Sequence, residues 1–455
     1  PAAHGVDGVA DADFVLYVTA DADDGTDDAD ADVPLAWAVH CEVDQFGRPT
    51  AGQVHFHSQY FGLSIETLRS TALHEIVHAL AFSSDLLPTF RNGLGDAWAP
   101  TTATADARGE TVTVVTTPAV RDAARAHLGC DTVAGAELED SGGISSAGSH
   151  WESRVFGPEL MAASIGAAQN SPALSSLTLA LFEDSGWYRP DYAAAEPLAW
   201  GRGAGCAFVE SACIDKASGA VLPEGSSLFC TTAAEAGCTS DRKRRGACAR
   251  LQYASAITPA SQRYFDDAAA GGPAFFDYCP VFAGSSGAAA SCADASATMY
   301  ELEWGSAHGD ASLCFTSTLL NTSYVVVGSA HHAACHRHAC VGTPPRLVVT
   351  VGSHDVECPP EGGAVGGIDG FDGALDCPPV AEVCPTCASN CSGHGVCGAA
   401  GVCACDAGWR GAACDARSCP GGCSGHGVCD GATGECACTG GYTGAACDEH
   451  AHCPA

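Results

Sequence analysis

The stretch TALHEIVHAL, residues 71–80, contains the residues that decide the fold of this chain and its chemistry. His74 and His78 stand four positions apart, and Glu75 directly follows the first of them. Residues four apart on an α-helix share a face, so the two imidazoles can hold the same ion. A catalytic zinc ion takes three protein ligands and leaves a fourth position open for water. The stretch therefore predicts a zinc site whose third ligand lies elsewhere. The alternative for the bare motif is two surface histidines beside an ordinary glutamate.

The residues around this motif predict an amphipathic helix over 64–83. Ser64 is suited to cap its N-terminus, and Glu66 places a negative charge in the first turn, where the helix dipole favours it. A narrow polar stripe contains both histidines, and an apolar stripe at helical spacing is expected to face the core. The apolar stripe consists of Ile65, Leu68, Ala72, Ile76 and Ala79.

Other elements are predicted on either side of this helix. Residues 14–20 and 52–57 are rich in β-branched and aromatic side chains and predict strands. Residues 171–192 predict a second helix with Gly186 at its C-terminal cap.

Three interpretations compete for the third zinc ligand. A glutamate on a following helix would lie in an Asn-Glu-x-x-x-Asp type of segment, and none stands out. The compact metzincin pattern requires Gly three positions and His six positions after His78, where Ala81 and Ser84 stand. This leaves a metzincin with an insertion that carries the last histidine far downstream.

Two histidines lie between the motif and residue 195 and are candidates for that distant ligand. His127 sits among arginines in a predicted helix and is interpreted as a surface residue. His150 follows His78 after 71 intervening residues, and Met161 comes eleven positions later, after a turn-forming Gly-Pro pair. Taken singly, His150 suits a polar loop and Met161 suits a core. Their order and spacing together favour His150 as the ligand.

Composition indicates the setting and the partners. The 455 residues include 20 basic and 54 acidic side chains, a formal net charge of −34, which argues against a nucleic-acid partner. Of the 28 cysteines, only Cys41 and Cys130 fall in the first 200 residues. Because a reducing cytosol would not maintain such a disulfide framework, we expect an extracellular or cell-surface protein. No apolar run approaches the roughly 20 residues that span a bilayer. The chain begins at Pro1 and is expected to be a fragment of a longer precursor.

Two segments of unusual composition could be interpreted as metal-binding sites, and we do not favour that interpretation. The acidic segment 21–32 lacks the ligand spacing and closing Glu of a calcium loop and is interpreted as a solvated loop. The histidine-rich segment 329–340 contains Cys335 and Cys340, which we expect in disulfides and therefore unavailable as thiolate ligands.

The C-terminal part contains an internal repeat with six cysteines in each copy. The copies read CASNCSGHGVCGAAGVCACDAGWRGAACD and CPGGCSGHGVCDGATGECACTGGYTGAACD. Units this short cannot bury enough apolar surface, so disulfides must hold them. Each copy resembles an epidermal-growth-factor-like (EGF-like) module, and the resemblance implies pairing of the first cysteine with the third, the second with the fourth and the fifth with the sixth. Acidic residues typical of calcium-binding modules are missing, so we expect modules without calcium.

Residues from about 10 to 385 resemble the leishmanolysin family of metzincin proteases. The similar segments appear in family order and include ADFVLYVTA, LAWAVHC, HEIVHALAFS, SHWE, ELMAAS, LTLALFEDSGWYRPDY and WGRGAGCAFVESAC. The resemblance implies an α+β chain with a metzincin (zincin-like) catalytic domain, N-terminally incomplete, a disulfide-rich leishmanolysin-type domain, and tandem EGF-like modules. The expected domains are residues 1–195, 196–383, 384–415 and 416–448.

The resemblance also implies roles for single residues. His74, His78 and His150 would hold one zinc ion, Glu75 would be the catalytic acid and base, and Met161 would form a turn beneath the site. Ala81 departs from the family, which usually has Gly there. If the backbone needs positive φ at this position, Ala destabilises it by about 1 kcal/mol.

The resulting functional prediction is a zinc-dependent endopeptidase that acts on extracellular proteins or peptides. The alternative is an adhesion or matrix-interaction protein whose protease domain is an inactive or weakly active scaffold. The EGF-like modules predict an extracellular or cell-surface partner under either interpretation.

Overall fold

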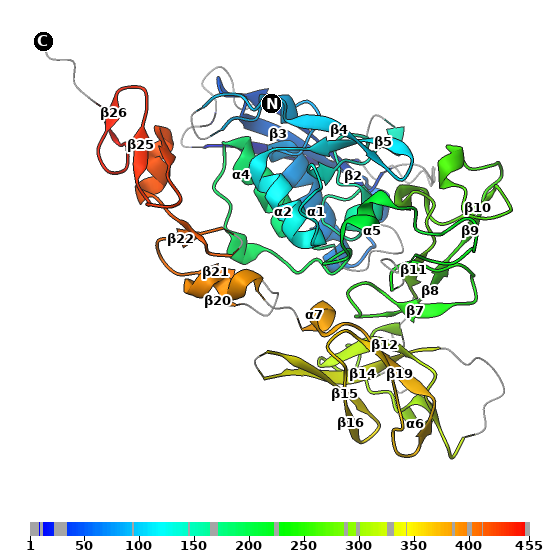
Figure 1. The fold of residues 1–455 in the computed structure, drawn as a ribbon. Helices are drawn as coiled ribbons and strands as arrows, with labels where there is room; N and C mark the ends of the chain where they lie inside the picture. Colours follow the sequence, from blue (N-terminus) through cyan, green and yellow to red (C-terminus); the bar gives the residue numbers. More distant parts are fainter. Residues whose placement is uncertain are drawn as a thin grey trace, which may run out of the picture.

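The computed structural model describes residues 9–450 apart from a set of short segments. These segments are 10–11, 22–33, 93–94, 144–145, 164–171, 223–226, 286–289, 297–300, 325–331, 343, 385–386, 398–402 and 412. Figure 1 shows a body of helices and small sheets in blue to green, a sheet-rich unit in yellow beside it, and small modules in orange to red that run back along the body. The chain contains both helices and small, mostly antiparallel sheets, so the predicted α+β class is confirmed. The acidic segment 21–32 lies outside the described residues except for Asp21.

The first sheet supports the helix that carries the predicted zinc motif. It contains β1 (Val15–Ala20), β2 (Ala36–Val43) and β3 (Pro49–Phe56) in the order β1-β3-β2, with β1 parallel and β2 antiparallel to β3. Both predicted strands are therefore present. Helix α1 (Ile65–Leu80) follows β3 and packs against β2 and β3.

Helix α1 begins where the sequence predicts. The Ser64 hydroxyl accepts a hydrogen bond from the Thr67 N–H at 3.2 Å, which satisfies one of the free amides of the first turn. The predicted apolar stripe is wrong at its first residue, because Ile65 is 73% exposed. The helix contributes to the core through its later turns, where Val77 and Ala79 are buried.

A second small sheet and three helices complete the region around α1. The sheet contains β4 (Thr102–Ala107), β5 (Glu110–Val115) and β6 (Ala136–Glu137). The helices are α2 (Pro118–Leu128), the short α3 (Ser153–Phe156) and α4 (Ser176–Ser185), and α2 packs on α4. Gly186 caps α4 in the left-handed region with φ 73°, as predicted. A Cβ at this position would lie 2.3 Å from the Arg91 carbonyl oxygen, so only glycine fits.

The largest hydrophobic core joins this region to the chain that follows. It contains buried residues from Val77 to Val281, including Trp200, Phe208 and Phe229 beyond position 195. The elements of this second part are α5 (Cys206–Glu210), β7 (Ala236–Cys238), β8 (Arg245–Ala249), β9 (Leu251–Gln252), β10 (Ala270–Gly271) and β11 (Val281–Gly284). The domain boundary at residue 195 stays a prediction, and the core extends across it.

A separate core lies under an antiparallel six-stranded sheet. Its order is β16-β15-β14-β12-β19-β17, built from β12 (Ser312–Ser317), β14 (His332–Val341), β15 (Arg346–Val351), β16 (His354–Glu357), β17 (Gly363–Gly366) and β19 (Ala374–Cys377). Short elements around it are α6 (Glu301–Trp304), β13 (Leu320–Asn321), β18 (Phe371–Asp372) and α7 (Val380–Val383). The irregular cysteine spacing predicts loops and short strands, and the extended sheet goes beyond that prediction.

Disulfides bond the cysteine-rich part throughout. Cys335 pairs with Cys292 and Cys340 pairs with Cys384, so neither offers a thiolate, as predicted. Five further bridges are Cys130–Cys206, Cys213–Cys279, Cys230–Cys248, Cys238–Cys314 and Cys358–Cys377. Cys41 is free and exposed.

The two C-terminal modules have the same plan. Each has a six-residue 3₁₀ segment and two short hairpins. The first module contains β20 (Gly395–Cys397), β21 (Cys403–Cys405), β22 (Trp409–Arg410) and β23 (Ala416–Arg417). The second contains β24 (Gly427–Cys429), β25 (Cys436–Cys438), β26 (Tyr442–Thr443) and β27 (Glu449–His450). The implied pairing is present in Cys391–Cys403, Cys405–Cys414, Cys419–Cys429, Cys423–Cys436 and Cys438–Cys447. The side chain of Cys397 lies outside the described residues, so the pairing of Cys387 with Cys397 stays a prediction.

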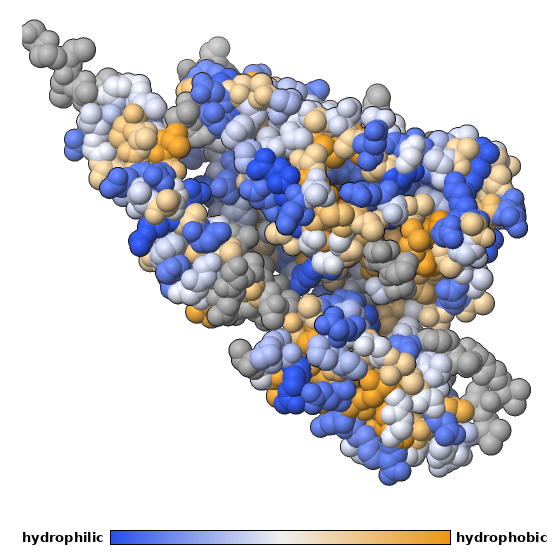
Figure 2. Space-filling model, viewed as in Figure 1, coloured by the Kyte–Doolittle hydropathy of each residue, from blue (hydrophilic) through white to orange (hydrophobic). Residues whose placement is uncertain are grey.

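The visible surface is mixed in hydropathy. Figure 2 shows hydrophilic residues over much of the visible face, with apolar residues in small separate patches. Within the described residues, no helix combines the length and the apolar character needed to cross a bilayer.

Candidate metal centre

Helix α1 presents His74 and His78 on one side, one helical turn apart. The helix ends at Ala81, whose N–H donates to the Val77 carbonyl, and the Tyr188 hydroxyl donates to the carbonyl of Leu80 at 3.1 Å. Ala81 has φ −154°, outside the left-handed region. The destabilisation that positive φ would cause at this position therefore does not arise, and Ala fits the site where the family usually has Gly.

His150 reaches α1 because hydrogen bonds fix the loop on both sides of it. The Glu139 N–H donates to the carbonyl of His150 at 2.9 Å, just after strand β6. The Trp151 N–H donates to the Met161 carbonyl at 2.9 Å, and the indole N–H of Trp151 donates to the Thr178 hydroxyl on α4 at 2.9 Å. Trp151 is fully buried, so the adjacent imidazole is anchored to the core.

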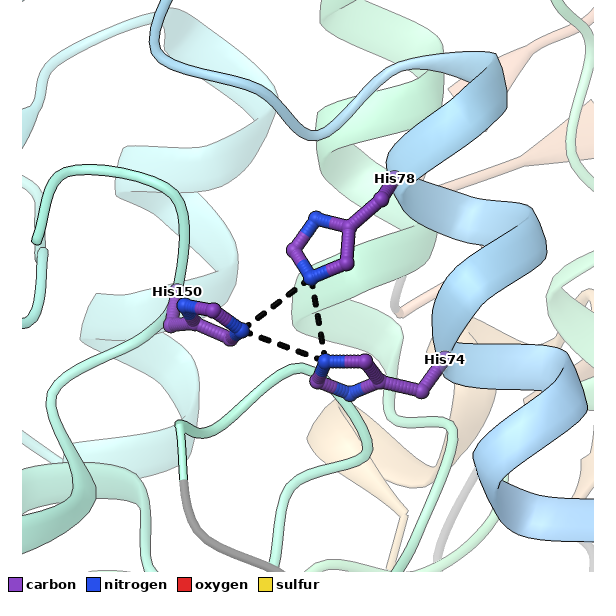
Figure 3. A group of neighbouring side chains, drawn as sticks. All are labelled: His74, His78 and His150. Carbon is purple, nitrogen blue, oxygen red and sulfur yellow. Dashed lines mark hydrogen bonds between the residues drawn. The ribbon is translucent and has the colours of Figure 1, made fainter. Parts of the chain in front are cut away.

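The three predicted histidines, here called the histidine trio, meet at their Nε2 atoms. His74 and His78 are 3.0 Å apart at these atoms, and each lies 3.1 Å from Nε2 of His150 (Figure 3). The third candidate ligand therefore lies beside the first two. His127 is elsewhere: it is half-buried, which corrects the surface interpretation, because its Nε2 bonds the Trp200 carbonyl at 2.7 Å.

The protonation of the trio follows from its other ring nitrogens. Each Nδ1 faces a main-chain carbonyl, that of Leu160 at 2.6 Å, Phe82 at 2.6 Å or Ser146 at 2.9 Å. A carbonyl oxygen only accepts, so each Nδ1 carries the hydrogen. Burial lowers the pKa of all three rings, that of His150 to about 3, so they are neutral. Every Nε2 is therefore unprotonated and carries a lone pair that can bind a metal ion.

Three lone pairs that converge at 3.0–3.1 Å repel one another unless a cation lies between them. In a tetrahedral zinc site with Zn–N bonds of about 2.0–2.1 Å, the ligand nitrogens lie about 3.3 Å apart. The spacing, the neutral imidazoles and the main-chain acceptors on each Nδ1 match what a zinc ion requires of its ligands. The trio thus fits a divalent metal ion without rearrangement of the backbone.

Glu75 lies beside the trio on α1 and is buried, at 6% exposure. Burial raises the pKa of this carboxyl group to about 8. Among the described residues, none donates a hydrogen bond to its carboxylate. A carboxyl group in this setting can take up and release a proton near neutral pH.

Met161 lies in a tight turn that contacts the trio through the backbone. Leu160, the preceding residue, supplies the carbonyl that orients His74. The turn begins at Gly157, which has φ 47°, and a Cβ there would lie 2.4 Å from the Trp200 ring. A turn is therefore present at Met161, which is fully buried, and its role beneath a zinc ion stays a prediction.

Glu159 holds this turn and is a residue that sequence reasoning missed. Its fully buried carboxylate accepts hydrogen bonds from the Met161 N–H at 2.5 Å, the Thr178 hydroxyl at 2.7 Å, and the Ser175 hydroxyl and N–H at 2.7 and 3.1 Å. Nothing in GPELMAAS separates it from a solvated glutamate, because its partners on α4 are distant in sequence.

Comparisons with known proteins agree with this geometry. Residues 1–392 match the family model for leishmanolysin, the peptidase M8 family, and residues 387–417 and 419–450 each match a teneurin-like EGF domain. The chain is 31% identical over 399 residues to leishmanolysin of Leishmania major, covering 84% of this chain and 61% of that protein. It is 34% identical over 300 residues to a leishmanolysin-like peptidase of Drosophila pseudoobscura pseudoobscura, covering 57% and 43%. It therefore spans about half the length of the curated relatives it matches.

Proposed function

The chain belongs to the leishmanolysin family of metallopeptidases, and on this premise we propose that it is a zinc-dependent endopeptidase that hydrolyses peptide bonds of extracellular proteins. The observation that supports the proposal most directly is the convergence of three neutral imidazoles beside a buried carboxyl group. The disulfide framework and the EGF-like modules support an oxidising, extracellular setting.

In this proposal His74, His78 and His150 hold the metal, and Glu75 handles the protons. Zinc held by neutral imidazoles keeps its double positive charge and would supply Lewis acidity toward the scissile carbonyl and acidify water at neutral pH. A carboxylate oxygen of Glu75 accepts a proton from the attacking water and then delivers it to the departing amine. The low exposure of Glu75 raises the pKa of its carboxyl group, and a cation bound by the adjacent histidines would lower that pKa and favour the carboxylate.

The other parts of the site act through position. The Leu160, Phe82 and Ser146 carbonyls fix the tautomer of each ring, so all three lone pairs face one point. The Met161 turn and Glu159 keep the Leu160 carbonyl in place. The EGF-like modules would supply an extracellular or cell-surface contact.

A chelator-reversible protease assay tests the proposal. The purified chain is incubated with casein, treated with a zinc chelator and then given Zn²⁺ again. We expect cleavage, its loss with the chelator, and its return with zinc. A correctly disulfide-bonded chain that binds zinc at the trio and cleaves no protein substrate would instead support the adhesion alternative, in which the protease fold is a scaffold.

A further inference from the structure

Another group of metal-binding side chains lies at the ends of β1 and β3. Asp21, His55 and His57, here called the end-of-strand cluster, place their ligand atoms within 4.8 Å of one another. The Asp21 carboxylate lies between the two imidazoles, with one oxygen 2.9 Å from His55 Nε2 and the other 2.6 Å from His57 Nδ1. None of these residues belongs to the histidine trio.

The sheet fixes the backbone at all three positions. His55 lies in β3, and His57 directly follows Phe56, the last residue of the strand, with its backbone still extended. Two residues apart in extended backbone, their side chains point to the same side. The Asp21 N–H donates to the Phe56 carbonyl at 3.3 Å, which extends the β1–β3 ladder by one residue and sets Asp21 opposite His57. The His57 N–H donates to the Leu35 carbonyl at 3.0 Å. A site on such strands is better ordered than a site on a loop.

The contacts around the His55 ring suit a metal ligand. Trp37 stacks on it with ring centroids 5.1 Å apart. Thr19 Oγ1 lies 2.9 Å from His55 Nδ1 and also 3.4 Å from the Val54 carbonyl. In the tautomer with the hydrogen on Nδ1, the hydroxyl accepts from Nδ1–H and donates to that carbonyl, so Nε2 of His55 can bind an ion in place of its contact with Asp21.

We propose that Asp21, His55 and His57 bind a second divalent ion of the zinc class and that this ion clamps the end of β1 to the end of β3. The side chains of His55, His57 and Asp21 are 14%, 20% and 44% exposed, so water can complete the coordination. Two imidazoles with one carboxylate favour Zn²⁺ and similar transition metals over Ca²⁺ or Mg²⁺, which prefer oxygen ligands.

Binding at this cluster requires a local exchange of partners. In the metal-free cluster the imidazole N–H groups can donate to Asp21, so an ion must displace those protons and lengthen the 2.9 and 2.6 Å distances between the carboxylate oxygens and the ring nitrogens. In a tetrahedral site with bonds of about 2.0–2.1 Å the ligand atoms lie about 3.3 Å apart. Rotation of the partly exposed Asp21 carboxylate provides that adjustment. We therefore expect weaker binding here than at the buried trio.

Counting bound metal separates the two sites. The full chain, in a Cys41→Ser background that removes the exposed thiol, is stripped with a chelator and dialysed against buffered Zn²⁺. We expect two equivalents of zinc in this chain and one in His57→Gln, Asp21→Asn and His150→Gln. The double variant His57→Gln/His150→Gln should bind none. His40→Gln, a change on the neighbouring strand β2, should keep both equivalents.

A thermal melt provides a second measurement that does not depend on catalysis. Zn²⁺ should raise the melting temperature of the His150→Gln variant and should not raise that of the double variant. Retention of two equivalents in both His57→Gln and Asp21→Asn would overturn the proposal, as would a single equivalent that only His150→Gln removes. If the trio bound no metal, one equivalent lost in His57→Gln would still support the second site, so the two proposals fail separately.

Discussion

The histidine trio and the end-of-strand cluster place imidazoles in opposite settings. In the trio the outer ring nitrogens donate to main-chain carbonyls, and the remaining lone pairs point at one another inside the protein. In the cluster the rings point at a carboxylate on a partly exposed surface. The trio is therefore already arranged for an ion, whereas the cluster must exchange hydrogen bonds for metal bonds.

The carboxyl groups of the two sites differ in the same way. Glu75 is buried and receives no hydrogen bond from a described residue, so it is available for proton transfer. Asp21 contacts both imidazoles of its cluster and is available only as a ligand. We infer that a free carboxyl group beside the metal ligands, more than the ligands alone, would distinguish the proposed hydrolytic centre from the proposed structural site.

The largest expected effect is at Glu75. Glu75→Gln should lower kcat by about 10³-fold while the trio keeps its zinc, because only the proton carrier is lost. Glu66→Gln, an exposed change in the first turn of α1, is the control and should leave activity unchanged. Protease assays and metal analysis on the same preparations check this. Wild-type turnover by Glu75→Gln would show that the carboxyl groups do not distinguish the two sites.

A buried histidine outside both sites shows what burial does without metal. His336 in β14 is fully buried, and burial lowers the pKa of its ring from 6.5 to about 4. Between these values the unfolded chain binds a proton that the folded chain does not, so stability falls as the pH drops from 6.5 to 4. The loss from this residue is about 3 kcal/mol across the window. Urea denaturation of wild type and His336→Leu should show a shallower pH dependence in the variant, and equal slopes would contradict the assignment.

Glu159 tests whether the trio depends on its turn. Glu159→Gln replaces an acceptor of four hydrogen bonds with an amide that cannot accept them all, and should reduce stability by about 2 kcal/mol. Because the Leu160 carbonyl orients His74, zinc affinity should also fall about tenfold. Competition with a zinc-binding dye measures this, with Glu66→Gln as the matched control. Unchanged zinc affinity in a destabilised Glu159→Gln variant would show that the turn supports the fold without positioning the ligand.

The smallest effect is expected at Ala81. Its φ of −154° gives glycine no conformational advantage, and the residue is fully buried. Ala81→Gly should therefore destabilise the chain by about 0.5–1 kcal/mol through backbone entropy, with no gain in activity. Thermal denaturation and the protease assay check this. Higher stability in the variant would mean that the end of α1 is strained by the alanine.

Local sequence signals were sufficient to predict elements and site residues where neighbours in sequence are neighbours in space. The Ser64 cap, the spacing of His74 and His78, and Gly186 at the end of α4 predicted elements that the structure contains. His150 could be selected because only two histidines lie between the motif and residue 195 and Met161 follows it. The family resemblance supplied the EGF-like cysteine pairing, of which five bridges are described.

Contacts between distant segments could not be predicted in this way. The carbonyls of Leu160 and Ser146 act through backbone atoms, which leave no mark on residue type. Glu159 accepts hydrogen bonds from residues at α4 that are distant in sequence. The exposure of Ile65 was missed because helical spacing alone does not say which turns of a helix meet the core. The end-of-strand cluster arises from a parallel pairing of β1 with β3, across 34 positions between Asp21 and His55.

The most direct test of the central claim is the zinc content of His150→Gln beside that of His127→Gln, both in the His57→Gln background that lacks the second site. His127 was the other candidate for the distant ligand and lies outside the trio. We expect His150→Gln to lose zinc and His127→Gln to retain one equivalent. Zinc retained by His150→Gln at the wild-type affinity, or lost equally from both variants when they are folded, would contradict it.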